Sequence, residues 1–168
     1  MVKAPIPPEA IDTLMKARAI ILMMALCLVA SALCFADNAQ MGAWKLNLAK
    51  SNLGPGAPKN SVVVYQVEGD NVKVTVDGTD DDGKPIHSEW AGKFDGKDYP
   101  VIGDPSFDAR SYTVIDDRTL GFNFKKGGKL KASGRIEVST DGKRRTVTMR
   151  AIDAKGKKVK SAAVYDKQ

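Results

Sequence analysis

The chain has 168 residues, 26 basic and 20 acidic side chains, a formal net charge of +6, two cysteines and one histidine, His87. This length fits one domain with an appendage. Both cysteines, Cys27 and Cys34, lie in an N-terminal segment that we expect to be removed. The mature chain therefore excludes a disulfide framework, a cysteine-ligated metal site and a cysteine nucleophile, and a single histidine argues against a histidine-based triad.

The N-terminal segment has the pattern of a secretory signal peptide. Residues 19–36 form an uncharged run of 18 residues that follows the basic stretch 15–18 and ends in small residues at Ala36. We predict a signal helix over 1–36 that is cleaved after Ala36, with Met15 as an alternative start. A retained membrane anchor and lipoprotein processing at Cys34 are the alternatives. If this segment is cleaved, we expect a periplasmic or secreted protein with no stable membrane span.

The mature chain, 37–168, has a hydrophobic period of two, which is typical of half-buried strands. Asp-Gly and Gly-Gly turn signals recur at short intervals, as in hairpins. The pattern predicts about ten strands, at 43–49, 61–68, 72–78, 86–94, 98–102, 109–116, 118–125, 129–139, 144–153 and 158–166. The Gly- and Pro-rich segment 51–61 is expected to be a loop.

Short connections between successive strands predict an antiparallel up-and-down meander. Closing this sheet into a barrel would remove its exposed edges, whereas a sandwich is the alternative. The absence of long crossovers favours the barrel. We therefore expect an all-β fold with one β-barrel domain over 37–168.

The mature chain resembles the calycin superfamily, which contains lipocalins and fatty-acid-binding proteins, and exported bacterial lipocalin-like proteins of unassigned role. Gly42-Ala43-Trp44 matches the Gly-x-Trp motif of the first calycin strand, and Val164-Tyr165 resembles the Val-Tyr close of the fatty-acid-binding branch. The resemblance implies a barrel that binds a small amphipathic or apolar molecule in its lumen. The segment 51–61 replaces that branch's helical lid, and Ala163 replaces its terminal arginine.

The ligand-binding candidates are Arg135, Tyr165, Arg150 and Trp90. In the resemblance, Arg135 falls where an inward arginine lies, and Tyr165 keeps one half of an anion clamp. An inward arginine would offer a bidentate fork for a carboxylate or phosphate. The alternative places Arg135 and Arg150 on the solvated outer face. Both arginines could also cover Trp44, and Trp90 could pack in the core or line a pocket.

Two other patterns suggest chemistry less strongly. Asp80, Asp82 and Glu89 fit some positions of a calcium loop, but the flanking strands favour an acidic hairpin tip. His87 and Glu89 share one strand face and could form a proton-transfer pair, without a nucleophile nearby in the sequence. We expect no metal, no cofactor and no enzymatic activity.

The charge is uneven along the chain. Residues 121–168 hold 14 basic and 4 acidic side chains, and the basic stretches 143–145 and 155–158 are expected at hairpin tips at one end of the barrel. Such an end could dock on an anionic envelope surface, or its lysines could guard strand edges. Nucleic-acid binding is not expected. The sequence therefore predicts a monomeric, exported, non-enzymatic binding barrel, and the alternative is an interaction module with a solid barrel and a basic docking end.

Overall fold

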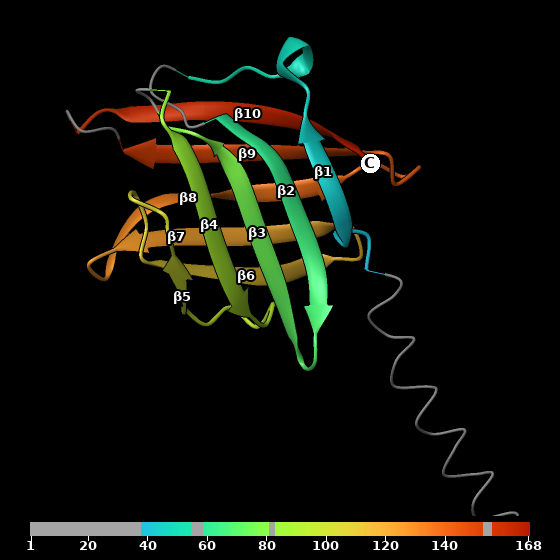
Figure 1. Cartoon of the computed structure of the whole chain (residues 1–168), viewed down its shortest axis with the longest axis horizontal. Helices are drawn as coiled ribbons and strands as arrows, with labels where there is room; N and C mark the ends of the chain where they lie inside the picture. Colours follow the sequence, from blue (N-terminus) through green and yellow to red (C-terminus); the bar gives the residue numbers. More distant parts are fainter. Residues whose placement is uncertain (1–37, 55–58, 81–82, 153–155) are drawn as a thin grey trace, which may run out of the picture. The chain divides into compact units, whose positions relative to one another are not determined.

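Ten antiparallel strands form a closed barrel in which sequence neighbours pair and the first strand also pairs with the last (Figure 1). The structure is a computed structural model that describes residues 38–54, 59–80, 83–152 and 156–168. The strands are β1 (Gly42–Leu46), β2 (Lys59–Glu68), β3 (Asn71–Thr79), β4 (Pro85–Gly92), β5 (Tyr99–Ile102), β6 (Ala109–Asp116), β7 (Thr119–Lys126), β8 (Lys129–Val138), β9 (Arg144–Ile152) and β10 (Lys158–Lys167). The expected all-β meander and its closure are confirmed.

The strands form because apolar side chains alternate with polar ones. In β3, Val72, Val74 and Val76 are buried, and the residues between them are partly exposed. The turn that joins β2 to β3 contains Gly69 at φ +60°, a left-handed conformation that favours glycine. One face of each strand thus turns toward the interior of the barrel, and the turns reverse the chain.

The largest boundary difference from the sequence prediction is at β1, which was expected to run to residue 49. The strand ends at Leu46 because Asn47 caps a short 3₁₀ helix, η1 (Leu48–Lys50), where the Asn47 Oδ1 accepts a hydrogen bond from the Lys50 amide at 3.1 Å. Between β1 and β2 the chain forms η1 and then a loop, of which 55–58 lie outside the described residues, and β2 begins at Lys59, within the segment 51–61 that was expected to be a loop. The other strand ends lie within two residues of the expected positions.

Trp44 closes one end of the barrel. Its ring is completely buried, and its Nε1 donates a hydrogen bond to the Gln40 carbonyl at 2.9 Å. Gln40 in turn donates from Nε2 to the Arg118 carbonyl at 2.9 Å, which ties the chain before β1 to the turn between β6 and β7. Gly42 has φ +107°, so the glycine of the Gly-x-Trp motif adopts a conformation that other residues rarely take. The motif therefore forms the closed end.

The expected signal peptide over 1–36, including Met15 and Cys34, lies outside the described residues. Within the described ranges, no helix has the length and apolar character needed to cross a lipid bilayer.

Candidate ligand-binding site

The barrel encloses a cavity of about 670 Å³. Its wall is mainly apolar in the middle, where side chains from five strands meet: Val63, Val74, Val76, Phe122, Ile136 and Val147. Ile152 and Lys160 line it near the ends of β9 and β10. Because Trp44 pairs with Lys167 at the other end of β10, these residues mark the end opposite the tryptophan, which we call the mouth. The interior is therefore hollow, and the solid barrel of the alternative interpretation is wrong.

Arg145 is the most buried charged side chain of the cavity wall, with 1% of its surface exposed. Its guanidinium lies over three aromatic rings, at 5.1 Å from the Trp44 centroid, 5.0 Å from Tyr65 and 4.8 Å from Tyr165. Its Nε and Nη1 have no hydrogen-bond partner in the described part of the chain. Cation–π contacts stabilise a buried cation, but they leave its N–H donors available. Arg145 is therefore a buried cation at the cavity wall whose charge has no carboxylate partner among the described residues.

Tyr165 lies where the sequence analysis expected a polar group of the lumen. Its side chain is buried, lines the cavity and contacts Arg145. Burial raises the pKa of the phenol to about 12, although the nearby Arg145 cation opposes this shift. Burial also raises the pKa of Tyr112, another lining residue. Both hydroxyls therefore stay protonated at neutral pH and can donate hydrogen bonds.

A second polar group lies nearer the mouth and consists of Arg110, Asp104 and Ser88, all of which line the cavity. Arg110 Nη2 forms an ion pair with Asp104 Oδ2 at 2.5 Å and donates to Ser88 Oγ at 3.3 Å. The Arg110 and Asp104 side chains are only 5% and 12% exposed. The Arg110 guanidinium also lies 4.9 Å from the centroid of Phe124. This arginine, unlike Arg145, is neutralised by a carboxylate.

Arg135 and Arg150 do not line the cavity. Both are exposed, and they lie on adjacent strands, where Arg135 pairs with Thr148 and Arg150 pairs with Ser133. The inward orientation that the resemblance implied is wrong, because the apolar residues of β8 and β9 occupy the opposite face. The role of covering Trp44 belongs instead to Arg145, with Lys167 Nζ at 5.2 Å from the ring centroid.

The sequence contains a signal that points to Arg145 and Arg110, although the sequence analysis did not select them. Arg145 alternates in step with Val147 and Met149, which line the cavity. Arg110 alternates in step with Tyr112, which also lines it. An arginine on the apolar face of a strand is therefore the better candidate for the lumen than one on the polar face.

Trp90 packs in an aromatic cluster and does not line the cavity. It is 1% exposed, and its Nε1 donates to the Arg110 carbonyl at 3.0 Å. Its ring stacks on Phe94 at 6.3 Å and meets Tyr112 edge-on at 4.8 Å. The core alternative of the sequence analysis describes its position, and the pocket-lining alternative does not.

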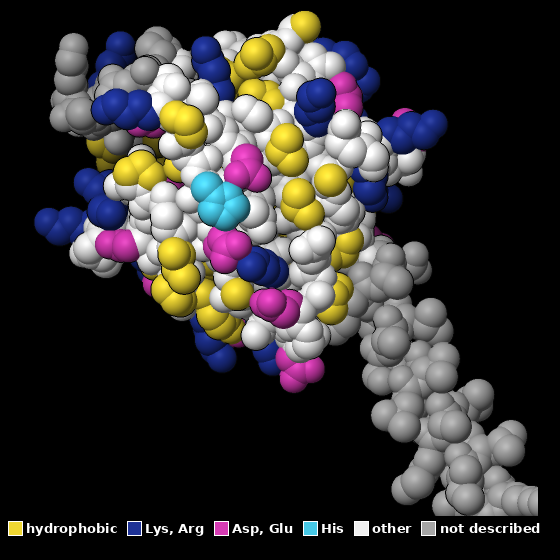
Figure 2. All heavy atoms as spheres, viewed as in Figure 1, with side chains coloured by type: hydrophobic (Ala, Val, Ile, Leu, Met, Phe, Trp, Pro, Cys, Tyr) yellow, Lys and Arg dark blue, Asp and Glu magenta, His cyan; other side chains and the backbone are white. Residues whose placement is uncertain are grey.

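His87 lies on the outer face of β4, among acidic side chains (Figure 2). Its Nδ1 is 2.7 Å from Asp77 Oδ1, and its Nε2 is 3.7 Å from Glu89 Oε1. The hydrogen bond with Asp77 raises the His87 pKa, and the hydrogen bond from Lys73 lowers the Glu89 pKa. The side chains of His87 and Asp77 are exposed, those of Lys73 and Glu89 are half-buried, and none of the four lines the cavity. The expected His87–Glu89 pair is therefore close in space but lies outside the lumen.

The calcium alternative concerned residues at the turn between β3 and β4. Asp81 and Asp82 lie outside the described residues. Across the described ranges, no group of three or more His, Cys, Asp or Glu side chains is placed to hold a metal ion.

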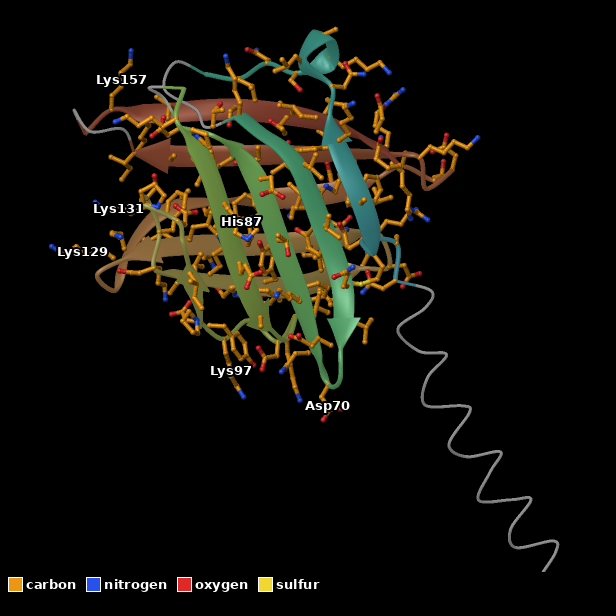
Figure 3. The ribbon with its side chains drawn as sticks, viewed as in Figure 1. Asp70, His87, Lys97, Lys129, Lys131 and Lys157 are labelled. Carbon is orange, nitrogen blue, oxygen red and sulfur yellow. The ribbon has the colours of Figure 1, made fainter. Side chains whose placement is uncertain are left out.

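The two basic stretches lie at opposite ends of the barrel, which corrects the expectation of one basic end. The stretch 143–145 opens β9 beside the closed end, whereas the second stretch joins β9 to β10 at the mouth. Successive hairpins of a meander alternate between ends, which explains this separation. Lys129, Lys131 and Lys157 are all labelled on the left of the view, the side of the mouth, with Lys157 apart from the other two (Figure 3). Lys155 lies outside the described residues.

Comparisons with known proteins give no family. No family model matches the chain, and no curated protein matches it. Among solved structures, it is similar to a redesigned β-barrel, mFAP1, bound to DFHBI, with 19% identity, a TM-score of 0.41 and coverage of 78% of this chain and 99% of that chain. It is also similar to EF1p2_mFAP2b bound to DFHBI, with 14% identity, a TM-score of 0.43 and coverage of 77% and 94%. Membership of the calycin superfamily stays a prediction.

Proposed function

We propose that the protein is an exported, non-enzymatic barrel that binds a small amphipathic anion in its cavity. The observation that carries this proposal is the combination of a hollow, apolar interior with a buried arginine, Arg145, that has no carboxylate partner in the part of the chain that the structure describes. Leaving a guanidinium buried and unpaired is costly, and an anionic ligand would remove that cost. Binding of an anion would therefore offset the cost of leaving the Arg145 charge buried without a partner.

The ligand class follows from the groups that line the two regions of the cavity. The apolar middle favours an aliphatic or aromatic body, at about 25 cal/mol for each Å² of apolar surface removed from water. The positive charge of Arg145 and the protonated Tyr165 hydroxyl, which both line the cavity, favour a carboxylate or another small oxyanion at the closed end. Hydrogen bonds to a charged group contribute about 1.5–3 kcal/mol, which corresponds to roughly 10- to 150-fold in affinity.

A pair of matched ligands tests this proposal. The exported protein is purified and stripped of lipid, and bound 1-anilinonaphthalene-8-sulfonate is displaced with dodecanoate or with dodecanol. Both ligands have the same chain length, but only dodecanoate carries the anion. We expect dodecanoate to bind at least about tenfold more tightly. Equal affinities, or no displacement by either ligand, would contradict the proposal.

Export is part of the proposal and has its own test. The N-terminal pattern supports secretion, and sequencing of the protein recovered from the periplasm or medium should begin at Asp37. A retained N-terminus would favour the membrane-anchored alternative. Docking of the mouth on an anionic surface remains the second candidate, supported by Lys129 and Lys131 on that side, and steep weakening by salt would distinguish it from binding in the lumen.

A further inference from the structure

Positive side chains line the cavity at both of its ends. Arg145 lies at the closed end, whereas Lys131 and Lys160 line the mouth end. On β9, the step from Arg145 to Ala151 covers about 20 Å, at about 3.3 Å per residue. Ala151 pairs with Ala132, the neighbour of Lys131 in β8. The cavity therefore has cations on both sides of its apolar middle.

The place of Lys131 in the cavity wall depends on a β-bulge in β8. In β7, Phe124 pairs with Ala132, and the next residue of β7 pairs with Leu130, so Lys131 is the extra residue of the bulge. Strict alternation with the buried Ala132 would place Lys131 on the outer face. A bulge interrupts this alternation and redirects a side chain. Lys131 accordingly lines the cavity on the mouth side (Figure 3).

The mouth end of the cavity wall carries a net positive charge. Asp104 is the one acidic side chain among the lining residues that the structure describes, and Arg110 neutralises it. Within the described ranges, Lys131 and Lys160 form no ion pair. Both lysines are exposed, so each should attract an anion as strongly as a surface ion pair does, which corresponds to about 1.4- to 5-fold in affinity. An anionic group at the mouth would therefore strengthen binding.

We propose, on the basis of the function above, that the ligand is an amphipathic dianion with one anionic group at each end of an apolar body. The first anionic group binds at Arg145, and the apolar body fills the middle of the lumen. The second anionic group lies at the mouth beside Lys131 and Lys160, where it keeps its contact with water. An α,ω-dicarboxylate is the simplest ligand of this class. The apolar end of a monocarboxylate would gain no attraction from the two lysines.

Diacids and monoacids of equal chain length test this inference. Each even-numbered diacid from decanedioate to octadecanedioate is compared with the monoacid of the same length, by displacement of 1-anilinonaphthalene-8-sulfonate at low ionic strength. A diacid that is too short to reach the mouth must bury its second carboxylate in the apolar middle, so it should bind more weakly than its monoacid. A diacid that reaches both ends should bind about 2- to 25-fold more tightly than its monoacid, and added salt should reduce this advantage.

Two double variants locate the second anion site. Lys131→Gln with Lys160→Gln removes both cations that line the mouth, and it should lower the ratio of diacid to monoacid affinity to about one or below. Lys129→Gln with Lys158→Gln is the matched control, because these lysines begin the same two strands, β8 and β10, and do not line the cavity. The control should keep the wild-type ratio. Urea denaturation midpoints close to that of the wild type show that both variants are folded.

The outcomes separate this inference from the function on which it rests. If no diacid binds more tightly than its monoacid, the inference is overturned, and a preference for dodecanoate over dodecanol still supports the function proposed above. An advantage that survives Lys131→Gln with Lys160→Gln, or that falls equally in the control, refutes the placement of the second anion. If the wild-type protein binds neither a monoacid nor a diacid, the function proposed above fails, and this inference fails with it.

Discussion

Replacing Arg145 with methionine separates the role of this residue in binding from its role in folding. Methionine keeps most of the length and apolar volume of the arginine stem but removes its charge and its donors. The wild-type guanidinium gains contacts with the rings of Trp44, Tyr65 and Tyr165, at 4.8–5.1 Å from their centroids. Each such contact stabilises by about 0.5–2 kcal/mol.

The loss of hydration of the buried Arg145 charge opposes this stabilisation and is of similar size. An unpaired buried ion costs several kcal/mol of lost hydration, and no carboxylate within the described ranges offsets this cost for Arg145. The two contributions nearly cancel. We therefore expect Arg145→Met to change the free energy of unfolding of the ligand-free protein by less than about 2 kcal/mol.

The effect on binding should be larger and selective. The affinity for dodecanoate should fall about 10- to 150-fold, since charge-assisted hydrogen bonds contribute about 1.5–3 kcal/mol. The affinity for dodecanol should stay within about threefold, because the apolar wall is unchanged. Dye displacement measures both affinities, and urea denaturation of the ligand-free protein measures the stability.

Arg135→Met is the matched control, because Arg135 is exposed on the outer face of β8. It should leave both affinities unchanged. The reasoning is refuted if Arg145→Met binds dodecanoate like the wild type, or if Arg135→Met loses that binding. A loss of about 3–5 kcal/mol in stability would also refute it, since that is the cost of breaking a paired buried charge.

Three further predictions concern the cavity, the sheet and the histidine. Val147→Trp fills the lumen and should weaken dodecanoate and dodecanol equally in the displacement assay, whereas Thr148→Trp on the outer face of the same strand should weaken neither. Gly134→Ala should reduce the free energy of unfolding by about 1–3 kcal/mol or more in urea denaturation, because its Cβ would clash with the Thr148 carbonyl oxygen; unchanged stability would contradict this packing. NMR titration should give His87, the single histidine, a pKa above its ordinary value that falls in Asp77→Asn, because the hydrogen bond with Asp77 favours the charged ring. The folded-state pKa is raised, so this contribution to stability is present below the ordinary histidine pKa and is lost as the pH rises through the raised value; an Asp77→Asn variant with an unchanged His87 pKa would contradict this account.

The sequence predicted the strands because the signals involved are local. Side chains alternate between the two faces of a strand whatever the strand contacts, as Val72, Val74 and Val76 show in β3. The turn at Gly69 needs a backbone conformation that depends on the residue itself. The early end of β1 was missed because Asn47 caps η1, and a single capping side chain is a weaker signal than a periodic pattern.

The sequence analysis expected Arg135 inside the barrel, and this expectation was wrong for a different reason. The resemblance placed Arg135 inside by analogy with a family pattern, although its neighbours in β8 put it on the polar face. The alternation of β9 placed Arg145 on the apolar face, and this local rule agrees with the structure. Tyr165, which the resemblance placed on the lumen, lines the cavity, and its part in ligand binding stays a prediction.

By itself, the amino-acid sequence determined the strand count, the antiparallel order and the face on which each side chain lies, since these follow from period two and from turn residues. Only the tertiary structure decided that the lumen is hollow, because this depends on how far side chains from ten closed strands reach across one space. The tertiary structure also decided which groups contact the two buried arginines. Arg110 meets Asp104 from the loop between β5 and β6, whereas Arg145 meets only aromatic rings among the described residues, and neither environment can be read from its own strand.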